Sequence, residues 1–140
     1  MANRTVQEVM TQSPTAIESN ESAIEAARMM LAENVGSLPV VQGNELVGMV
    51  TDRDLVLQVM AKDLDPNAVP VSEVCSEDPV VATPDEPLHA ALGRMAAEQV
   101  RRLPVVEGQR LVGILAQADV SRAADSKSTG KLVETISEET

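Results

Sequence analysis

The stretch LPVVQGNELVGMVTDRDL at residues 38–55 decides the fold, because it returns in closely similar form as LPVVEGQRLVGILAQADV at residues 103–120. In each copy, two runs rich in valine and leucine have the length of a β-strand. The short segment between them contains a glycine, Gly43 in the first copy and Gly108 in the second. This pattern is typical of a β-hairpin. The sequence therefore predicts the same hairpin twice.

The repeat extends to both sides of the hairpin, since residues 6–55 align with residues 71–120 without a gap, at an offset of 65 residues. The shared residues include prolines and turn glycines, such as Pro14 with Pro79 and Gly43 with Gly108, which makes chance a poor explanation. Self-similarity of this kind indicates two copies of one structural unit. A unit of about 60 residues buries little core on its own. We therefore expect the two copies to pack together as a pseudo-twofold pair.

Each copy is predicted to fold in the order β-α-β-β-α, an α/β architecture of the α+β type. The first helix has apolar residues at the spacing of one helix face, which in the first copy are Ala23, Ala26, Ala27, Met30 and Leu31. The other expected landmarks are short strands at Thr15–Ile17 and Val80–Ala82, N-caps at Asn20 and Asp85, and second helices that begin near Asp52 and Gln117.

The predicted organisation has four segments: repeat 1 at residues 1–62, a linker with two prolines at 63–70, repeat 2 at 71–124, and a polar tail at 125–140. In the tail, an apolar stripe of Leu132, Val133 and Ile136 suits a short helix. A frayed acidic tail is an equally good interpretation, because so short a pattern is weak.

Composition excludes several classes of protein. The 140 residues include 11 Lys and Arg against 22 Asp and Glu, a net charge of −11. This balance argues against nucleic acid and against an anionic membrane surface as partners. The single cysteine, Cys75, cannot form an intrachain disulfide, and no apolar run has the length of a signal core or a membrane span. We therefore expect a cytoplasmic protein.

The repeat resembles a tandem pair of cystathionine β-synthase (CBS) domains, often called a Bateman module. The matching features are VxEV at the start of each copy, the helix with its methionine, LPVVxGxxLVG, and GMVTDRDL in the first copy. They cover residues 6 to about 124, nearly the whole chain. The sequence is especially similar to small stand-alone CBS pairs, some of which are induced by stress or low oxygen.

This resemblance implies a regulatory module that takes an adenosine-containing ligand between its repeats and signals to a separate effector protein. AMP, ADP, ATP and S-adenosylmethionine are all compatible. No enzyme activity, no cofactor and no metal site are expected. The resemblance also implies a homodimer, with apolar helix residues Ala23, Met30, Leu88 and Met95 at its interface. The alternative is a structural or protein-interaction CBS pair, of the stress-induced kind, whose nucleotide site is vestigial.

The family's ligand signature, Gly-h-h-Thr/Ser-x-x-Asp with h apolar, is complete at residues 48–54. Here a strand ends and a helix begins, so the Thr51 hydroxyl and free N–H groups suit a phosphate, and the Asp54 carboxylate suits ribose hydroxyls. The alternative is a plain N-cap at Thr51 or Asp52. In the second copy Ala116 replaces the hydroxyl and Asp119 keeps the carboxylate, which weakens the prediction of a second site.

The resemblance also implies that Arg101 and Arg102 of repeat 2 reach the phosphate of a nucleotide held by Thr51 and Asp54. Arginine suits this role because its planar guanidinium matches phosphate oxygens. A solvated pair that balances an acidic surface is the alternative. Arg53 is a third candidate for the phosphate, or for an ion pair on the exposed helix face. The apolar slot for adenine is expected at Thr15, Ala16, Ile17 and Pro39, any of which is also suited to ordinary core.

Overall fold

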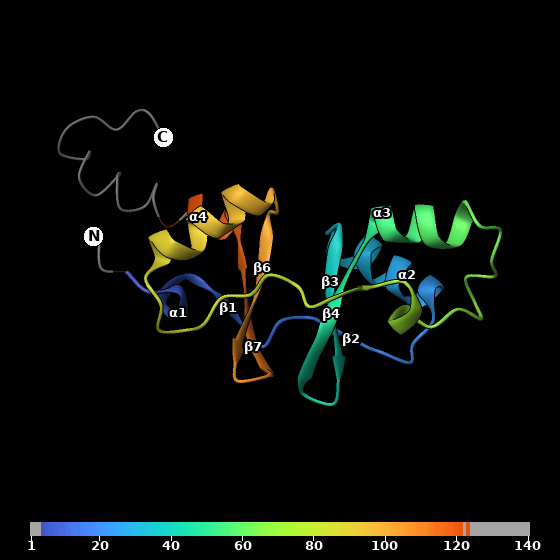
Figure 1. The fold of residues 1–140 in the computed structure, drawn as a ribbon, viewed down its shortest axis with the longest axis horizontal. Helices are drawn as coiled ribbons and strands as arrows, with labels where there is room; N and C mark the ends of the chain where they lie inside the picture. Colours follow the sequence, from blue (N-terminus) through green and yellow to red (C-terminus); the bar gives the residue numbers. More distant parts are fainter. Residues whose placement is uncertain (1–3, 122, 124–140) are drawn as a thin grey trace. The chain divides into compact units, whose positions relative to one another are not determined.

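Both predicted hairpins are present in the computed structural model, which describes residues 4–121 and residue 123 (Figure 1). The two turn glycines, Gly43 and Gly108, hold φ angles of +67° and +65°, where a side chain would be strained. The strands are β3 (Ser37–Gln42) and β4 (Glu45–Thr51), which pair in antiparallel fashion, and β6 (Arg102–Glu107) and β7 (Arg110–Ala116).

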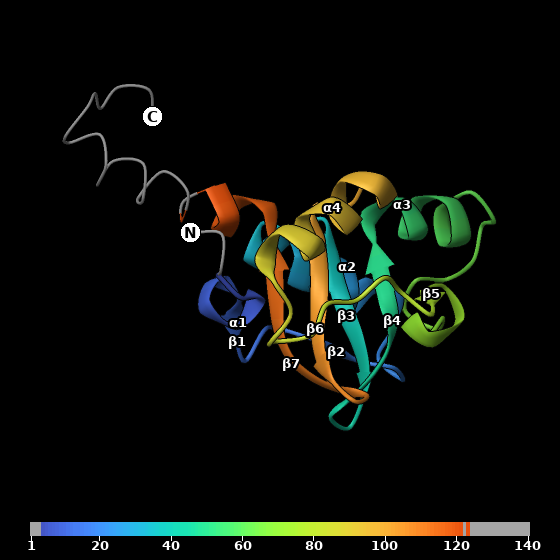
Figure 2. The ribbon, with the colours of Figure 1, turned by 60° about the vertical axis from the view of Figure 1, so that its left-hand side comes forward.

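The main helix of each repeat also lies where its apolar spacing predicts: α2 (Ala23–Glu33) in repeat 1 and α4 (Leu88–Glu98) in repeat 2 (Figure 2). Each helix buries one narrow face, which consists of Ala23, Ala26 and Met30 in α2 and of Ala91 and Met95 in α4. Leu31 does not belong to this face, since 84% of it is exposed.

The predicted N-caps of these helices are wrong. Ser22 caps α2, because its hydroxyl accepts a hydrogen bond from the Glu25 N–H at 3.3 Å. In α4 the capping position is taken by Pro87, which has no side-chain hydrogen bond. Asn20 and Asp85 lie two residues too early, in the turns that lead into the helices.

The first strand of each copy is shorter than predicted. Strand β2 (Ile17–Glu18) runs parallel to β3, and in repeat 2 only Ala82 forms a parallel bridge, to Val105. The physical reason lies just upstream, where Ser13 and Asp78 have φ angles of +50° and +54°. These left-handed residues turn the chain, so that pairing starts only after the following proline.

The beginnings of the two repeats are exchanged between the hairpins. Strand β1 of repeat 1 pairs with β7 of repeat 2, and β5 of repeat 2 pairs with β4 of repeat 1. The exchanged segments contain α1 (Val6–Val9) and β1 (Thr11–Gln12), and η2 (Val71–Glu73) and β5 (Ser76–Glu77).

The chain consequently forms two compact units that do not coincide with the sequence repeats. The repeat-1 unit consists of Pro14–Val80 and Val106–Leu111. The repeat-2 unit consists of Met1–Ser13, Val81–Val105 and Val112–Thr140, as far as these residues are described. The packing of one unit against the other, expected from the repeat, stays a prediction.

Two glycines allow this exchange. A Cβ atom on Gly48 of β4 would collide with the carbonyl oxygen of Ser76 and lie 3.1 Å from the Cys75 sulfur. A Cβ atom on Gly113, the equivalent residue of β7, would lie 2.5 Å from the Met10 sulfur and 3.0 Å from the Thr11 carbonyl oxygen. The glycine of each LVG motif therefore leaves room for the exchanged segment to lie directly against the strand.

The predicted linker is packed against the repeat-1 unit. The carbonyl of Val69 accepts the Ala23 N–H at 2.8 Å, and the carbonyl of Pro66 accepts the Ile24 N–H at 2.9 Å. These bonds satisfy donors in the first turn of α2 that have no partner within the helix. The tail at 125–140 lies outside the described residues.

The second helix of repeat 1 begins at the predicted residue, as α3 (Asp52–Leu55), and continues as the π-helix η1 (Val56–Met60). In repeat 2, residues 117–121 are helical, again as predicted.

No helix in the described part of the chain combines the length and apolar character needed to cross a membrane. The core of the repeat-1 unit is aliphatic and centres on Ile17, Ala26, Leu38, Val40, Val50 and Val59.

Candidate functional site

The corner between β4 and α3 is closed by a reciprocal pair of hydrogen bonds. The Thr51 hydroxyl oxygen accepts the Asp54 N–H at 3.0 Å, and Asp54 Oδ2 accepts the Thr51 N–H at 2.9 Å. This is a capping box, so the N-cap interpretation of Thr51 is correct and Asp52 does not cap. The two residues are half-buried. The Thr51 hydroxyl hydrogen and Asp54 Oδ1 take no part in the box, so both groups keep hydrogen-bonding capacity for a ligand.

The start of β3 supports this corner. Ser37 lies opposite Thr51 in the β3–β4 register, and the Asp52 N–H donates to the Gly36 carbonyl at 2.9 Å. A Cβ atom on Gly36 would lie only 3.1 Å from Asp52 Oδ2. The Asp52 side chain therefore lies close to the backbone of Gly36.

The predicted adenine slot lies in the same unit. Thr15 is exposed and Ala16 is half-buried, whereas the Ile17 side chain is 1% exposed and belongs to the core cluster. Pro39 is buried in β3, opposite Met49 of β4. The structure thus brings Thr15 and Ala16 to an accessible edge, and it places Ile17 within the core.

Arg53, the third candidate for the phosphate, is exposed on α3.

The equivalent corner of repeat 2 is built differently. Ala116 is 6% exposed and has no hydroxyl to cap the following helix. Asp119 instead accepts a hydrogen bond from the Thr11 hydroxyl, at 3.2 Å, in the exchanged segment. The Gln117 N–H donates to the Arg101 carbonyl at 2.8 Å, which repeats the backbone contact of Asp52 with Gly36.

Arg101, Arg102 and Asp119 belong to the repeat-2 unit, and Thr51 and Asp54 belong to the repeat-1 unit. Arg101 is exposed and Arg102 is half-buried. The assignment of both arginines to the nucleotide of Thr51 and Asp54 stays a prediction.

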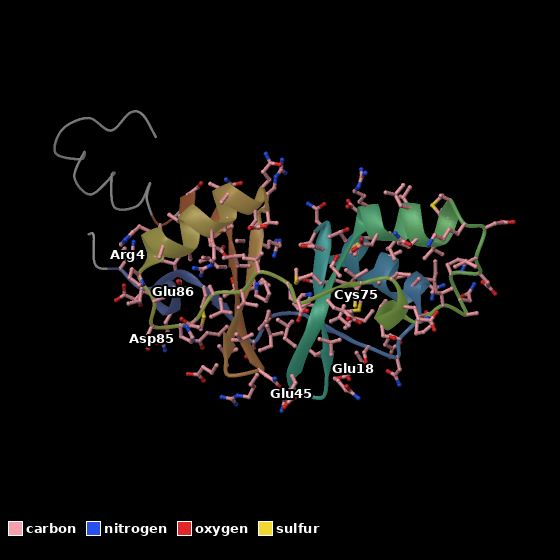
Figure 3. The ribbon with its side chains drawn as sticks, in the orientation of Figure 1. Arg4, Glu18, Glu45, Cys75, Asp85 and Glu86 are labelled. Carbon is pink, nitrogen blue, oxygen red and sulfur yellow. The ribbon has the colours of Figure 1, made fainter. Side chains whose placement is uncertain are left out.

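Cys75, labelled in Figure 3, lies close to Gly48 of β4, and the sequence analysis missed this proximity to the candidate site. Burial raises the pKa of its thiol, the negative charge of Glu77 raises it further, and Asp54 adds a smaller effect in the same direction. A thiol with a raised pKa is protonated at neutral pH, so it is a poor nucleophile. Its closeness to Gly48 and Asp54 follows from the exchange of the segment that contains it.

No group of three or more His, Cys, Asp or Glu side chains suited to a metal ion occurs within residues 4–121 and 123. His89 is exposed on α4.

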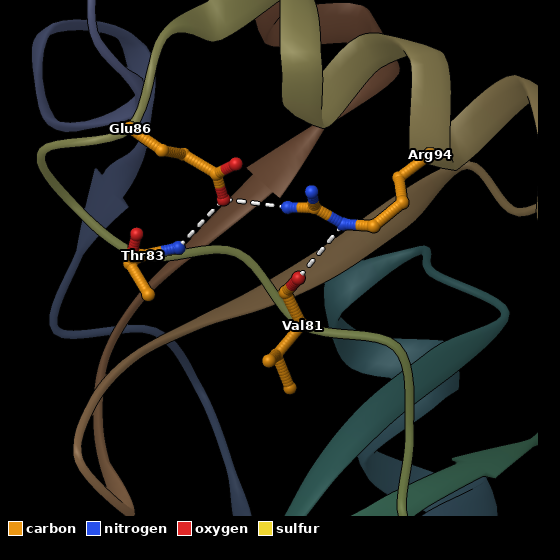
Figure 4. A network of polar contacts seen from close by, with 4 residues as sticks. All are labelled: Val81, Thr83, Glu86 and Arg94. Carbon is orange, nitrogen blue, oxygen red and sulfur yellow. Dashed lines mark hydrogen bonds and ion pairs between the residues drawn. The ribbon is translucent and has the colours of Figure 1, made fainter.

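A polar network in repeat 2 was also missed (Figure 4). Oε2 of Glu86 accepts hydrogen bonds from the Thr83 N–H at 2.9 Å and from Arg94 Nη2 at 2.5 Å. Arg94 Nε donates to the Val81 carbonyl at 3.2 Å. The signal that could have revealed it is a difference between the repeats, because Arg94 aligns with Met29.

Comparison with known proteins agrees with this architecture. The sequence pattern of the CBS domain matches residues 6–61 and 71–126. The chain is 39% identical over 133 residues to the CBS domain-containing protein YhcV of Bacillus subtilis (strain 168), and the match covers 94% of each protein.

Solved structures show the same fold with adenosine-containing ligands. CBSX2 in complex with AMP has a TM-score of 0.78 at 28% identity, and the match covers 89% of this chain and 98% of that one. The CBS domain pair of protein MJ0100, in complex with 5'-methylthioadenosine and S-adenosyl-L-methionine, has a TM-score of 0.75 at 28% identity, with the same coverage. With both repeats matched by the family pattern, this chain belongs to the CBS domain family, as a tandem pair of CBS domains.

Proposed function

We propose that the chain is a regulatory module that binds an adenosine-containing ligand and signals to a separate effector protein. The observation that carries this proposal is the corner at Thr51 and Asp54, where a hydroxyl and a carboxylate are held one helical turn apart by two hydrogen bonds of 3.0 and 2.9 Å. Such preorganisation lowers the entropy cost of binding. Asp54 accepts from the ribose, and the Thr51 hydroxyl donates to the phosphate.

The class of ligand is supported by two structures of the same fold, which hold AMP in CBSX2 and 5'-methylthioadenosine with S-adenosyl-L-methionine in MJ0100. All three molecules contain adenosine. In this chain the base lies at the edge formed by Thr15 and Ala16, beside Pro39, and Arg101, Arg102 and Arg53 are the cations available to a phosphate.

A regulatory role fits the family, since CBS pairs are generally regulatory and not catalytic.

A second candidate function is an interaction module with a vestigial site. Its support is that the capping box already gives Thr51 and Asp54 partners within the chain. Its further support is repeat 2, where Ala116 is buried and Asp119 accepts from Thr11.

An ultraviolet spectrum distinguishes the two functions. The chain contains no Trp, Tyr or Phe, so the purified protein absorbs very weakly between 260 and 280 nm. We expect a distinct band near 260 nm from nucleotide carried through purification, and its loss after denaturation and filtration. A protein without this band that also fails to bind added adenosine, AMP, ATP or S-adenosylmethionine would favour the interaction module.

We also propose that the chain forms a homodimer, through a different face from the one first expected. Ala23, Met30 and Met95 are 2%, 6% and 4% exposed, so the core of each unit already covers them. In the described part of the chain, the exposed large apolar residues are Leu31 on α2, Val100, and a group on η1 and near it that consists of Val56, Leu57, Met60 and Leu64. Exposed apolar groups that cluster on one helix are typical of an association surface.

Light scattering at micromolar concentration is expected to give twice the chain mass of 14.9 kDa. Replacing Met60, which is 71% exposed, with glutamate should lower this mass towards that of a monomer, because a charge is costly in an apolar interface. Gln109→Glu, in the exposed turn of the second hairpin, is the control. A monomer mass for the unchanged protein at every concentration would contradict the dimer.

A further inference from the structure

The network around Arg94 holds the segment that in repeat 2 corresponds to the proposed adenine slot. Glu86 is largely buried, with a side chain 16% exposed, and Arg94 is 36% exposed. The guanidinium spans two partners, since Nη2 binds the Glu86 carboxylate and Nε binds the Val81 carbonyl (Figure 4). A charged and planar group is thus fixed against the backbone of this segment.

The two repeats are geometrically equivalent at this place. Ile17 pairs in parallel with Val40 in repeat 1, and Ala82 pairs in parallel with Val105 at the same offset in repeat 2. By this offset Val81 is the equivalent of Ala16, a residue of the proposed adenine slot.

The side chains that face this position differ in chemistry. Arg94 is replaced in repeat 1 by Met29, a half-buried residue that packs against the core. A thioether has no N–H to donate, so Met29 cannot bind the Ala16 carbonyl as Arg94 binds that of Val81. The carboxylate is present in both repeats, because Glu21 is the equivalent of Glu86. Glu21 is exposed, and no ion pair of the described residues includes it.

We infer that Arg94, held by Glu86, closes the repeat-2 copy of the base slot, so that the module takes its adenosine-containing ligand through the slot of repeat 1. This inference rests on the proposed function. Arg94 already donates a hydrogen bond to the Val81 carbonyl, to which the amino group of a base would otherwise donate. In place of the apolar Met29 side chain of repeat 1, repeat 2 has the ion pair of Arg94 with Glu86, which a base would have to displace.

Two further features of repeat 2 agree with a closed site. Ala116 cannot donate to a phosphate, and Asp119 is engaged by the Thr11 hydroxyl. Two of these differences are substitutions, of Met29 by Arg94 and of Thr51 by Ala116, and the third is the contact of the retained carboxylate Asp119 with Thr11. Arg94 is therefore a specificity-determining residue that sets where the ligand binds.

The test transfers the closing group to repeat 1. Met29→Arg places a guanidinium at the equivalent position, where Glu21 can hold it. Titration with adenosine, which carries no phosphate, is expected to show a loss of affinity of about tenfold or more relative to the unchanged protein. The double variant Met29→Arg with Glu21→Ala should recover much of this loss, because the guanidinium is no longer held over Ala16.

Two control variants separate this effect from others. Met29→Leu keeps an apolar side chain of similar volume and should bind adenosine as the unchanged protein does. Ala32→Arg adds the same charge at an exposed position of α2 and should also leave binding unchanged. Thermal unfolding of each variant monitors the fold.

The outcomes distinguish this inference from the proposed function. If the unchanged protein binds no adenosine, AMP, ATP or S-adenosylmethionine, the proposed function is wrong and the inference falls with it. If the unchanged protein binds and Met29→Arg binds equally well, or if Glu21→Ala restores nothing, only the inference is overturned. Should Met29→Arg not fold, Arg94→Met with Ala116→Thr decides instead. Adenosine stoichiometry that rises above one per chain supports the closing role of Arg94, and a stoichiometry that stays at one contradicts it.

Discussion

Replacing Asp54 with alanine is expected to weaken AMP binding roughly tenfold to a hundredfold. The carboxylate is half-buried, and only Oδ2 is used in the capping box with Thr51. A hydrogen bond to a charged group contributes about 1.5–3 kcal/mol, which gives the expected loss. Isothermal titration calorimetry with AMP measures it directly.

Two controls make this result specific. Asp119→Ala removes the equivalent carboxylate of repeat 2, which binds Thr11, and should change AMP affinity much less. Asp54→Asn keeps an acceptor oxygen for the Thr51 N–H and should preserve the helix start while it removes the charge. Equal losses for Asp54→Ala and Asp119→Ala would contradict the assignment of one site to repeat 1.

Replacing Arg101 and Arg102 together with alanine is expected to weaken binding of AMP and, more strongly, of ATP, and to leave adenosine almost unchanged. Only the phosphates use the guanidinium groups, and each charge-assisted bond contributes about 1.5–3 kcal/mol. ATP should lose more because the net charge of −11 repels the more highly charged ligand once the arginines are gone. The backbone of Arg101, whose carbonyl holds the Gln117 N–H, is unaffected by the substitution.

The measurement is a titration with adenosine, AMP and ATP at two salt concentrations. Higher salt should reproduce part of the effect in the unchanged protein, because ionic attraction is screened within about 8–10 Å. Arg28→Ala with Arg110→Ala removes the same charge at two exposed positions and serves as the control. If adenosine loses as much affinity as ATP, the two arginines stabilise the fold and do not contact phosphate.

Much of the local structure was predictable because it depends on residues close together in the sequence. The hairpins follow from strand-length apolar runs around Gly43 and Gly108, whose positive φ angles confirm the turns. The capping box follows from Thr51 and Asp54, three residues apart, since this spacing lets each side chain reach the other's backbone N–H. The predicted N-cap of α2, Asn20, was wrong by two residues, because several polar residues precede the helix and the side-chain cap is made by Ser22.

The sequence by itself determined the duplication, the positions of the two main helices, the hairpins and the chemistry of the corner at Thr51. Only the tertiary structure decided which hairpin receives each exchanged segment. The strand edges of β4 and β7 are nearly alike, because both come from one repeated sequence, so periodicity carries no information about the partner. The bond of Asp119 with Thr11, which joins residues 108 positions apart, was likewise decided by the tertiary structure. Such contacts depend on where distant backbone segments meet, and that is set by packing and by close approach at Gly48 and Gly113.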